Sequence, residues 1–399
     1  MTPVGRDAAS DDELAFVADR LARAARPEDV FGPLGATRPD QLTRLRHQYR
    51  QLALAVHPDR HGSLPAAHQA FVVLQRLYTT ALELVQQGRY EHLDASSRTA
   101  GAVVISTRRR EYTLGLKLAE GDLADLYTCM ILQAGQTSAG ILKIARDGGD
   151  NDLLENEAMV LRHLLADMPD LAGKPVPPYV PRLLESFQYQ EPGGLERQIN
   201  AFPLAATERG PLPAAEMFSL EEIRREYRDG VDPKQMAWMW RRLLIALGHA
   251  HDRSVVHGAV LPSHILIHPE EHGLLLIDWC YSVHQPGLTG AAIPAIVAQY
   301  ERWYPASVLA KAVPTPAVDL EMALRCMVYL LGGDPLRGAL PARVPEPLQA
   351  YFQGALATVG QHTAWQLYQR FSDLLADLWG KRTFIPFSMP ARPDGGPAR

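Results

Sequence analysis

Three consecutive residues, His57, Pro58 and Asp59, combine a ring donor, a rigid turn and a carboxylate. Apolar residues of helical spacing precede them over 40–56, and a second stripe of that spacing follows over 65–88. Because proline ends a helix and stiffens the turn after it, this pattern predicts a helical hairpin with the three residues in its loop. In that loop the imidazole and the carboxylate are available to a binding partner.

The first of these two stripes also carries a set of basic residues. Arg44, Arg46 and Arg50 lie among its polar positions, and Asp40 is the one acidic residue there. We therefore expect a positive helix face, which would steer this segment onto an acidic surface.

A second set of residues capable of chemistry lies further along the chain. Lys143 follows a short apolar run in GILK, Glu157 lies in a stretch of helical pattern, and Asp278 follows the apolar run LLLI. Each would be an ordinary surface charge if it stood alone. Gly121, in LAEGDLADLY, fits either a simple turn or a phosphate-covering loop.

Residues 28–92 resemble the J domain of DnaJ-type co-chaperones. The resemblance rests on VFGPLGATRPDQLTRLRHQYRQLALAVHPDRHG and on AFVVLQRLYTTALEL after it. It implies that His57, Pro58 and Asp59 stimulate the ATPase of a DnaK-type chaperone and that the three arginines dock onto that chaperone. The glycine/phenylalanine-rich and cysteine-rich regions of full DnaJ proteins do not occur in the sequence. We therefore expect another part of the chain to select an as yet unidentified client protein.

Residues 111–390 resemble a protein kinase, most clearly in AHDRSVVHGAVLPSHILI and LLIDWC. The resemblance implies that Lys143 and Glu157 form the ion pair that holds the nucleotide phosphates. It also implies that Gly121 remains from the glycine-rich loop and that Asp278 binds magnesium. ATP and Mg²⁺ are the cofactors that these positions would take.

Two positions depart from the kinase pattern. Ala259 stands in the place of the aspartate that accepts the proton of the substrate hydroxyl, and a methyl group accepts no proton. His264 replaces an asparagine that helps to hold a second magnesium ion, and imidazole is a poor ligand for that cation. The resemblance therefore implies a pseudokinase.

A zinc site is the alternative interpretation of His264, His268 and His272, which recur at even spacing. The segment from His268 to His272 has the composition of an exposed turn between strands, so we do not expect these side chains to converge on a metal. The three cysteines are widely separated, which excludes a zinc ribbon or a disulfide framework.

Composition limits the other function classes. The net charge of −5 provides no general attraction for nucleic acid or acidic membranes. No apolar run approaches the length of a membrane span, and the polar N-terminus does not resemble a signal peptide, so we expect a cytoplasmic protein. Most of the 40 basic residues are arginine, which suggests a bacterial source with a GC-rich genome.

These patterns predict an α+β multidomain chain in which an all-α helical-hairpin J domain precedes a two-lobed protein-kinase-like fold. Strand-like runs from Tyr112 to Ile144 precede a mostly helical region. The expected parts are an N-terminal extension with a short amphipathic helix (1–27), the J domain (28–92), a linker (93–110), an N-lobe (111–204), a C-lobe (205–390) and a disordered tail (391–399).

The sequence favours a co-chaperone adaptor that recruits a DnaK-type chaperone and delivers it to the target of a catalytically impaired kinase-like domain. The alternative is an enzyme, an ATP-binding atypical kinase or nucleotide transferase with an appended J domain.

Overall fold

The computed structural model describes two compact units, Met1–Ala102 and Val103–Arg399, which we treat separately. The described residues are 14, 17, 18, 20, 21, 24, 26–32, 34, 38–56, 61, 64–86, 90, 103–166, 179–191, 194–207, 210, 211 and 214–390. The predicted sites at His57, Pro58 and Asp59 and the predicted tail 391–399 lie outside them.

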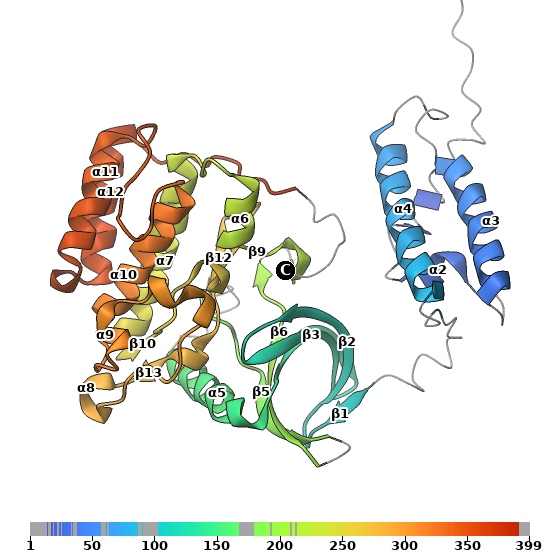
Figure 1. Ribbon diagram of the computed structural model, residues 1–399, viewed down its shortest axis with the longest axis horizontal. Coiled ribbons are helices and arrows are strands. Elements are labelled where there is room, and N and C mark those ends of the chain that lie inside the picture. The colour runs from blue at the N-terminus through green and yellow to red at the C-terminus, as the bar shows by residue number, and fades with distance from the viewer. Residues whose placement is uncertain are drawn as a thin grey trace, which may run out of the picture. The chain divides into compact units, whose positions relative to one another are not determined.

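The first unit is helical where it is described (Figure 1). Its helices are α2 (Pro27–Phe31), α3 (Arg38–Val56) and α4 (Pro65–Gln86). The two long helices form the predicted hairpin, and the Tyr49 and Tyr78 rings stack between them with centroids 4.0 Å apart. Buried apolar side chains from both helices fill its core, including Leu45, Leu74 and Leu77.

The N-terminal segment belongs to this same core. Leu14, Val17 and Leu21 are helical and buried, as the predicted amphipathic helix requires. Their burial means that this apolar face packs within the first unit and is not free for a partner.

A six-stranded antiparallel sheet opens the second unit. Its strands are β1 (Val104–Ser106), β2 (Glu111–Glu120), β3 (Ala124–Gln133), β4 (Gln136–Ala145), β5 (Glu185–Gln190) and β6 (Glu196–Pro203), in the order β1-β2-β3-β4-β6-β5. Helix α5 (Asn151–Leu165) packs against β6. The predicted linker extended to Arg110, whereas β1 pairs with β2 and residues 103–110 belong to this unit.

The remainder of the second unit is mainly helical (Figure 1). Helix α7 (Pro233–Asp252) is its central helix and begins as predicted, because the Asp232 carboxylate accepts a hydrogen bond from the Lys234 amide and Pro233 opens the first turn. The other helices are α6 (Leu220–Glu226), α8 (Pro286–Thr289), α9 (Ala306–Leu309), α10 (Pro316–Leu330), α11 (Glu346–Ala357) and α12 (Ala364–Trp379).

Short strands connect these helices and carry the loops of the candidate site. They are β7 (Ala206–Thr207), β8 (Gly210–Pro211), β9 (Phe218–Ser219), β10 (Val255–Val256), β11 (Ile265–His268), β12 (Gly273–Leu276) and β13 (Val283–His284). The chain is therefore mixed α+β with a largely antiparallel sheet, which confirms the predicted fold class at this level.

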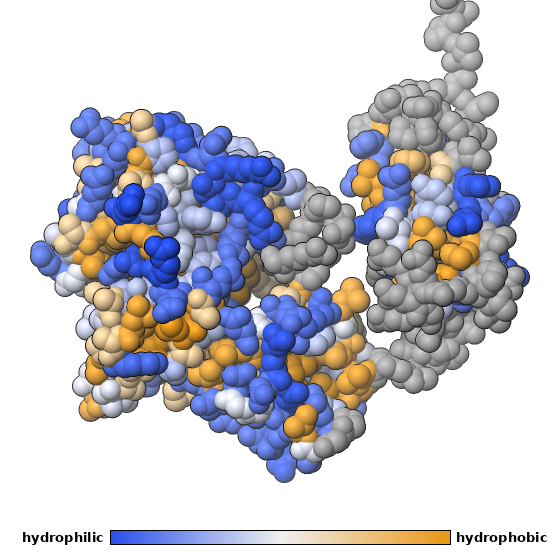
Figure 2. All heavy atoms as spheres, in the orientation of Figure 1, coloured by the Kyte–Doolittle hydropathy of each residue, from blue (hydrophilic) through white to orange (hydrophobic). Residues whose placement is uncertain are grey.

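On the face seen in Figure 2, hydrophilic residues predominate in the coloured part of the surface and apolar areas interrupt them. Leu116, Met130 and Leu132 are among the exposed apolar side chains of the sheet. In the described part of the chain no helix combines the length and apolar character needed to cross a bilayer.

Candidate functional site

Three of the predicted site residues meet where the sheet contacts the helical region. Lys143 on β4 is buried, with 5% of its surface exposed, and its Nζ donates to Glu157 Oε1 at 2.8 Å and to Asp278 Oδ1 at 2.6 Å. Cys280 Sγ lies 3.8 Å from the same Nζ. The structure thus brings together residues that come from three separate motifs.

Glu157 is fixed from two sides. Helix α5 carries it toward β4, where Lys143 contacts one of its carboxylate oxygens, and the Asn200 side-chain amide donates to the other at 2.9 Å. The same Asn200 amide also donates to the Leu154 carbonyl of α5. Asn200 was not identified from the sequence, because only the pairing of β6 with β4 places it opposite Lys143.

Asp278 adopts a left-handed backbone conformation with φ of 63°, and its side chain contacts Lys143 of β4. Burial acts to raise the pKa of this carboxyl, but the positive charge of Lys143, with a contribution from His264, holds its pKa far below the usual range. The His264 Nε2 lies 3.4 Å from Asp278 Oδ2. Asp278 is therefore an ionised carboxylate, and the cation that it pairs with is the Lys143 ammonium of the same chain.

The electrostatics of Lys143 agree with this description. Burial acts to lower its pKa, whereas Asp278, Cys280 and Glu157 together raise it well above its ordinary value. The ammonium is consequently the charged form at any physiological pH.

A metal ion would compete with this ammonium. Glu157, Asp278 and Cys280 offer ligand atoms within 4.8 Å of one another, the one such group among the described residues. The Nζ of Lys143 contacts all three of them, so it already occupies the position that a cation would take. The Cys280 thiol is also unsuited to magnesium, which prefers oxygen ligands.

Ala259, which we expected to leave the site without a proton acceptor, lies in the loop before β11. Ala259 is fully buried; its amide donates to His257 Nδ1 and its carbonyl accepts from His264 Nδ1 at 2.9 Å. The His264 ring thus connects the backbone of Ala259 with the carboxylate of Asp278. It braces Asp278 from the protein side.

Asp319 of α10 anchors this loop. Its two carboxylate oxygens accept the backbone N–H groups of His257 and Gly258, both at 2.8 Å, and the His251 ring lies 2.9 Å away. Charge-assisted bonds of this kind are among the stronger ones in proteins, so the loop is held rigidly.

His257 is buried and neutral. Its Nδ1 accepts from the Ala259 amide, and its Nε2 lies 2.9 Å from the Ile277 carbonyl, to which it therefore donates. Burial lowers the pKa of His257 to about 4. These contacts make His257 an internal brace between two loops.

Gly121 lies in the tight turn between β2 and β3. Its amide donates to the Ala124 carbonyl, and a Cβ at this position would lie 2.8 Å from that oxygen. The close backbone approach accounts for the glycine. The turn is bordered by the carboxylates of Glu120 and Asp125, which pair with Lys117. Arg146 donates to the Gly121 carbonyl at 3.0 Å and pairs with Glu120, so the two cations and two carboxylates around this turn engage one another.

The even spacing of His264, His268 and His272 does not produce a metal site in the structure. His268 lies 3.3 Å from Glu216, and the ring of His272 stacks between Trp238 and Phe384 at 4.2 Å on each side. The predicted turn between strands is present and Glu270 in it is exposed, but the two histidines are buried, with 3% of His268 and 7% of His272 exposed. His272 is covered by Phe384 of the C-terminal segment, residues 381–390.

Arg44, Arg46 and Arg50 are exposed on α3 of the first unit. The helix therefore presents a positive surface, as its composition predicted.

No protein-family model matches this chain, and no curated protein matches its sequence.

Proposed function

We propose that the protein is a co-chaperone adaptor in which a J domain recruits a DnaK-type ATPase and a kinase-like domain binds a client protein without phosphorylating it. The observation that carries the proposal is the exposure of Arg44, Arg46 and Arg50 on α3, which ends at Val56, the residue before His57 in the sequence.

The arrangement of the first unit favours docking. Exposed guanidinium groups, of which those of Arg46 and Arg50 share one side of the helix, attract an acidic partner surface and increase the rate of encounter. The apolar residues of the hairpin face its own core, and so leave this polar face available. His57 and Asp59 would then contact the ATPase as the helix docks.

The second unit is suited to binding more than to catalysis. Ala259 offers no proton acceptor, and Asp278 is engaged by Lys143 and His264. An ion-paired cluster at this position stabilises one arrangement of the two parts of the unit. Such a unit can act as a rigid scaffold for a client.

The decisive experiment measures ATP hydrolysis by a DnaK-type chaperone in single-turnover conditions with and without the full chain. We expect the wild-type chain to stimulate hydrolysis and His57→Gln to abolish the stimulation. His68→Gln is the matched control, because His68 is an exposed histidine on α4 of the same hairpin. Equal stimulation by the folded His57→Gln variant would contradict the proposal.

A second candidate is a variant phosphotransferase or nucleotide transferase. The observation in its favour is the buried contact between Lys143 and Glu157, at 2.8 Å, which a nucleotide-binding kinase would use. Incubation of the full chain with γ-labelled and with α-labelled ATP and magnesium or manganese tests it. Label incorporated by the wild type and lost in Asp278→Ala would support the enzyme.

A further inference from the structure

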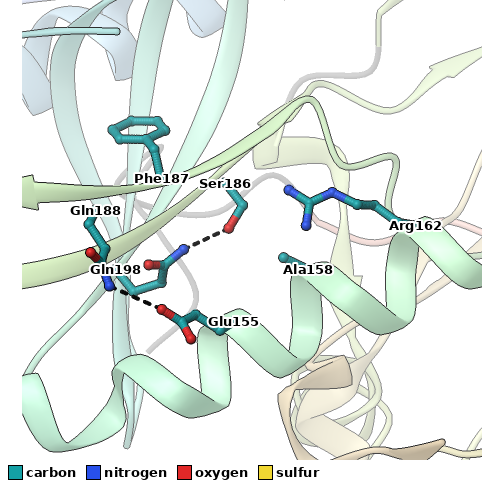
Figure 3. A pocket seen from close by; sticks show the side chains of 7 residues that line it. All are labelled: Glu155, Ala158, Arg162, Ser186, Phe187, Gln188 and Gln198. Carbon is teal, nitrogen blue, oxygen red and sulfur yellow. Dashed lines mark hydrogen bonds between the residues drawn. The ribbon is translucent and has the colours of Figure 1, made fainter.

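A hollow of about 420 Å³ lies between helix α5 and strands β5 and β6 (Figure 3). The amides on its sheet side are engaged within the unit, because Gln198 donates to Ser186 Oγ at 2.7 Å and Gln188 donates to Glu155 Oε1 at 3.1 Å. Side chains that bind one another in this way leave little specific chemistry for a ligand.

The C-terminal segment, residues 381–390, lies across a different surface, on the helical region. It runs from the end of α12 past the start of α7 to the end of α6 (Figure 1). It forms neither helix nor strand, and Pro386 and Pro390 favour an extended backbone. The surface beneath it, which we call the docking surface, consists of Tyr227, Gln235, Trp238 and His272.

The docking surface binds the main chain of this segment. Gln235 Nε2 donates to the Pro386 carbonyl at 2.8 Å, and the Tyr227 hydroxyl donates to the Ser388 carbonyl at 2.7 Å. Trp238 Nε1 donates to Gln235 Oε1 at 2.9 Å, which directs the Gln235 amide nitrogen toward the segment. Bonds to main-chain carbonyls do not depend on the side chains of the segment, so another extended segment could accept them equally well.

Aromatic contacts select the side chains of an occupant. The Phe387 ring stacks on Tyr227 with centroids 5.5 Å apart, and its centroid lies 6.3 Å from that of Trp238. Phe387 is only 6% exposed, whereas Phe384, which stacks on His272, remains 67% exposed. The chemistry that fits is therefore an aromatic anchor directly after a proline.

The attachment of the segment depends on few contacts. Within residues 381–390, all of which the structure describes, Phe387 is the one buried residue. Gly380, with φ of 71°, ends α12 immediately before the segment and provides a point about which it can turn away. Segments with few buried contacts open at low free energy without unfolding the remainder of the protein. The docking surface is thus accessible whenever the segment detaches.

We propose that the docking surface binds an extended segment of a partner protein with a proline followed by an aromatic anchor, in exchange for the chain's own C-terminal segment. Aromatic surfaces with donors for main-chain carbonyls suit such segments, because proline holds them extended before they bind. The C-terminal segment is a tethered competitor with an effective concentration of roughly millimolar. The inference goes beyond the proposed function and does not depend on the first unit.

Fluorescence anisotropy of the full chain tests the exchange. The first probe is a fluorescein-labelled peptide with the sequence of residues 383–390; the second has alanine at the position of Phe387. Phe387→Ala loosens the chain's own segment, so we expect this variant to bind the first probe about tenfold more tightly than the wild type does. Lys381→Ala is the matched control, because Lys381 is exposed on the same segment, and should bind as the wild type does.

A second variant tests the contact with the main chain of the probe. Tyr227→Phe, made in the Phe387→Ala chain, removes one hydroxyl donor and retains the ring. It should weaken binding of the first probe about fivefold. Three results would each overturn the inference: equal affinity of the wild type and Phe387→Ala for the first probe, equal binding of both probes by Phe387→Ala, and no binding by Phe387→Ala up to about 1 mM.

A second copy of this chain is the other occupant to test. Sedimentation velocity of the wild type at increasing concentration should show a monomer, because each chain covers its own docking surface. A dimer that Phe387→Ala removes would mean that two copies exchange their C-terminal segments, which would replace the partner protein in the proposal.

Discussion

Lys143 and Asp278, which are far apart in the sequence, form a direct ion pair of 2.6 Å, and Glu157 contacts the same ammonium at 2.8 Å. One cation is therefore shared by two carboxylates in the interior of the second unit. The Coulomb attraction between these charges is strong because water is largely excluded, and it offsets the cost of removing the charges from water. Loss of any one of the three side chains should therefore lower the stability of the unit.

Replacing the lysine tests this balance. Lys143→Met leaves the buried Glu157 and the partly buried Asp278 as neighbouring acids without their cation, and we expect the free energy of unfolding to fall by about 3–5 kcal/mol. Urea unfolding at pH 7, followed by tryptophan fluorescence, measures the change.

The matched control for this prediction is Lys117→Met. Lys117 also pairs with two carboxylates, Glu120 and Asp125, but its side chain is 38% exposed. Solvent screens that arrangement, so its loss should lower the free energy of unfolding far less than the loss of Lys143 does. Similar losses for the two lysine variants would contradict a structural role for the buried pair.

Nucleotide binding provides a second prediction. Because Lys143 is engaged by two carboxylates, we expect ATP and magnesium to leave the melting temperature of the wild type unchanged. Asp278→Asn removes one charge and frees the ammonium for a phosphate, so this variant should be stabilised by ATP. Differential scanning fluorimetry with increasing ATP measures both effects.

Asp377→Asn is the control for the nucleotide experiment, because Asp377 is exposed on α12 and remote from the cluster. A clear ATP-dependent shift in the wild type that Lys143→Ala abolishes would refute the prediction. It would favour the second candidate function, in which the cluster opens to admit nucleotide.

Sequence pattern predicted those features that depend on local chemistry. The start of α7 at Asp232 and Pro233 follows from capping and proline geometry, and the hairpins of β2 to β4 follow from short apolar runs between turns. Lys143, Glu157 and Asp278 could be grouped only because they occur in the order of a known family.

Features that depend on distant chain contacts were missed. Asn200 contacts Glu157 only because β6 lies beside β4, and nothing in its local sequence signals this role. His272 has the sequence context of an exposed turn, but stacking on Phe384 from the C-terminal segment buries it. Because the segment that buries His272 is distant in the sequence, the residues around His272 show no periodicity that would predict its burial.

The buried imidazole of His257 makes stability depend on pH. Its pKa is lowered to about 4 by burial, whereas an unfolded histidine titrates near its ordinary value of about 6.5. Between these values the unfolded state binds the additional proton, so the unfolding free energy falls as the pH decreases from about 6.5 to 4. The expected loss is roughly 3 kcal/mol for this group.

Unfolding in urea at a series of pH values checks this dependence. In His257→Gln, which does not titrate, the slope over this pH window should flatten, although the variant is less stable throughout. His68→Gln, in which an exposed histidine is removed, should retain the wild-type slope. An unchanged slope in His257→Gln would show that other groups dominate the pH dependence.

The segment of residues 381–390 is held to the helical region by aromatic contacts. His272 stacks between Trp238 and Phe384, and Gln235 Nε2 donates to the Pro386 carbonyl at 2.8 Å.

We expect His272→Ala to weaken the attachment of this segment by about 1–2 kcal/mol and to increase the population in which the segment is detached about tenfold. Trypsin cleavage after the exposed residues Lys381 and Arg382 should therefore accelerate by the same factor. His272→Phe retains an aromatic ring in the stack and should remain resistant, so equal cleavage of the alanine and phenylalanine variants would show that the stack does not hold the segment.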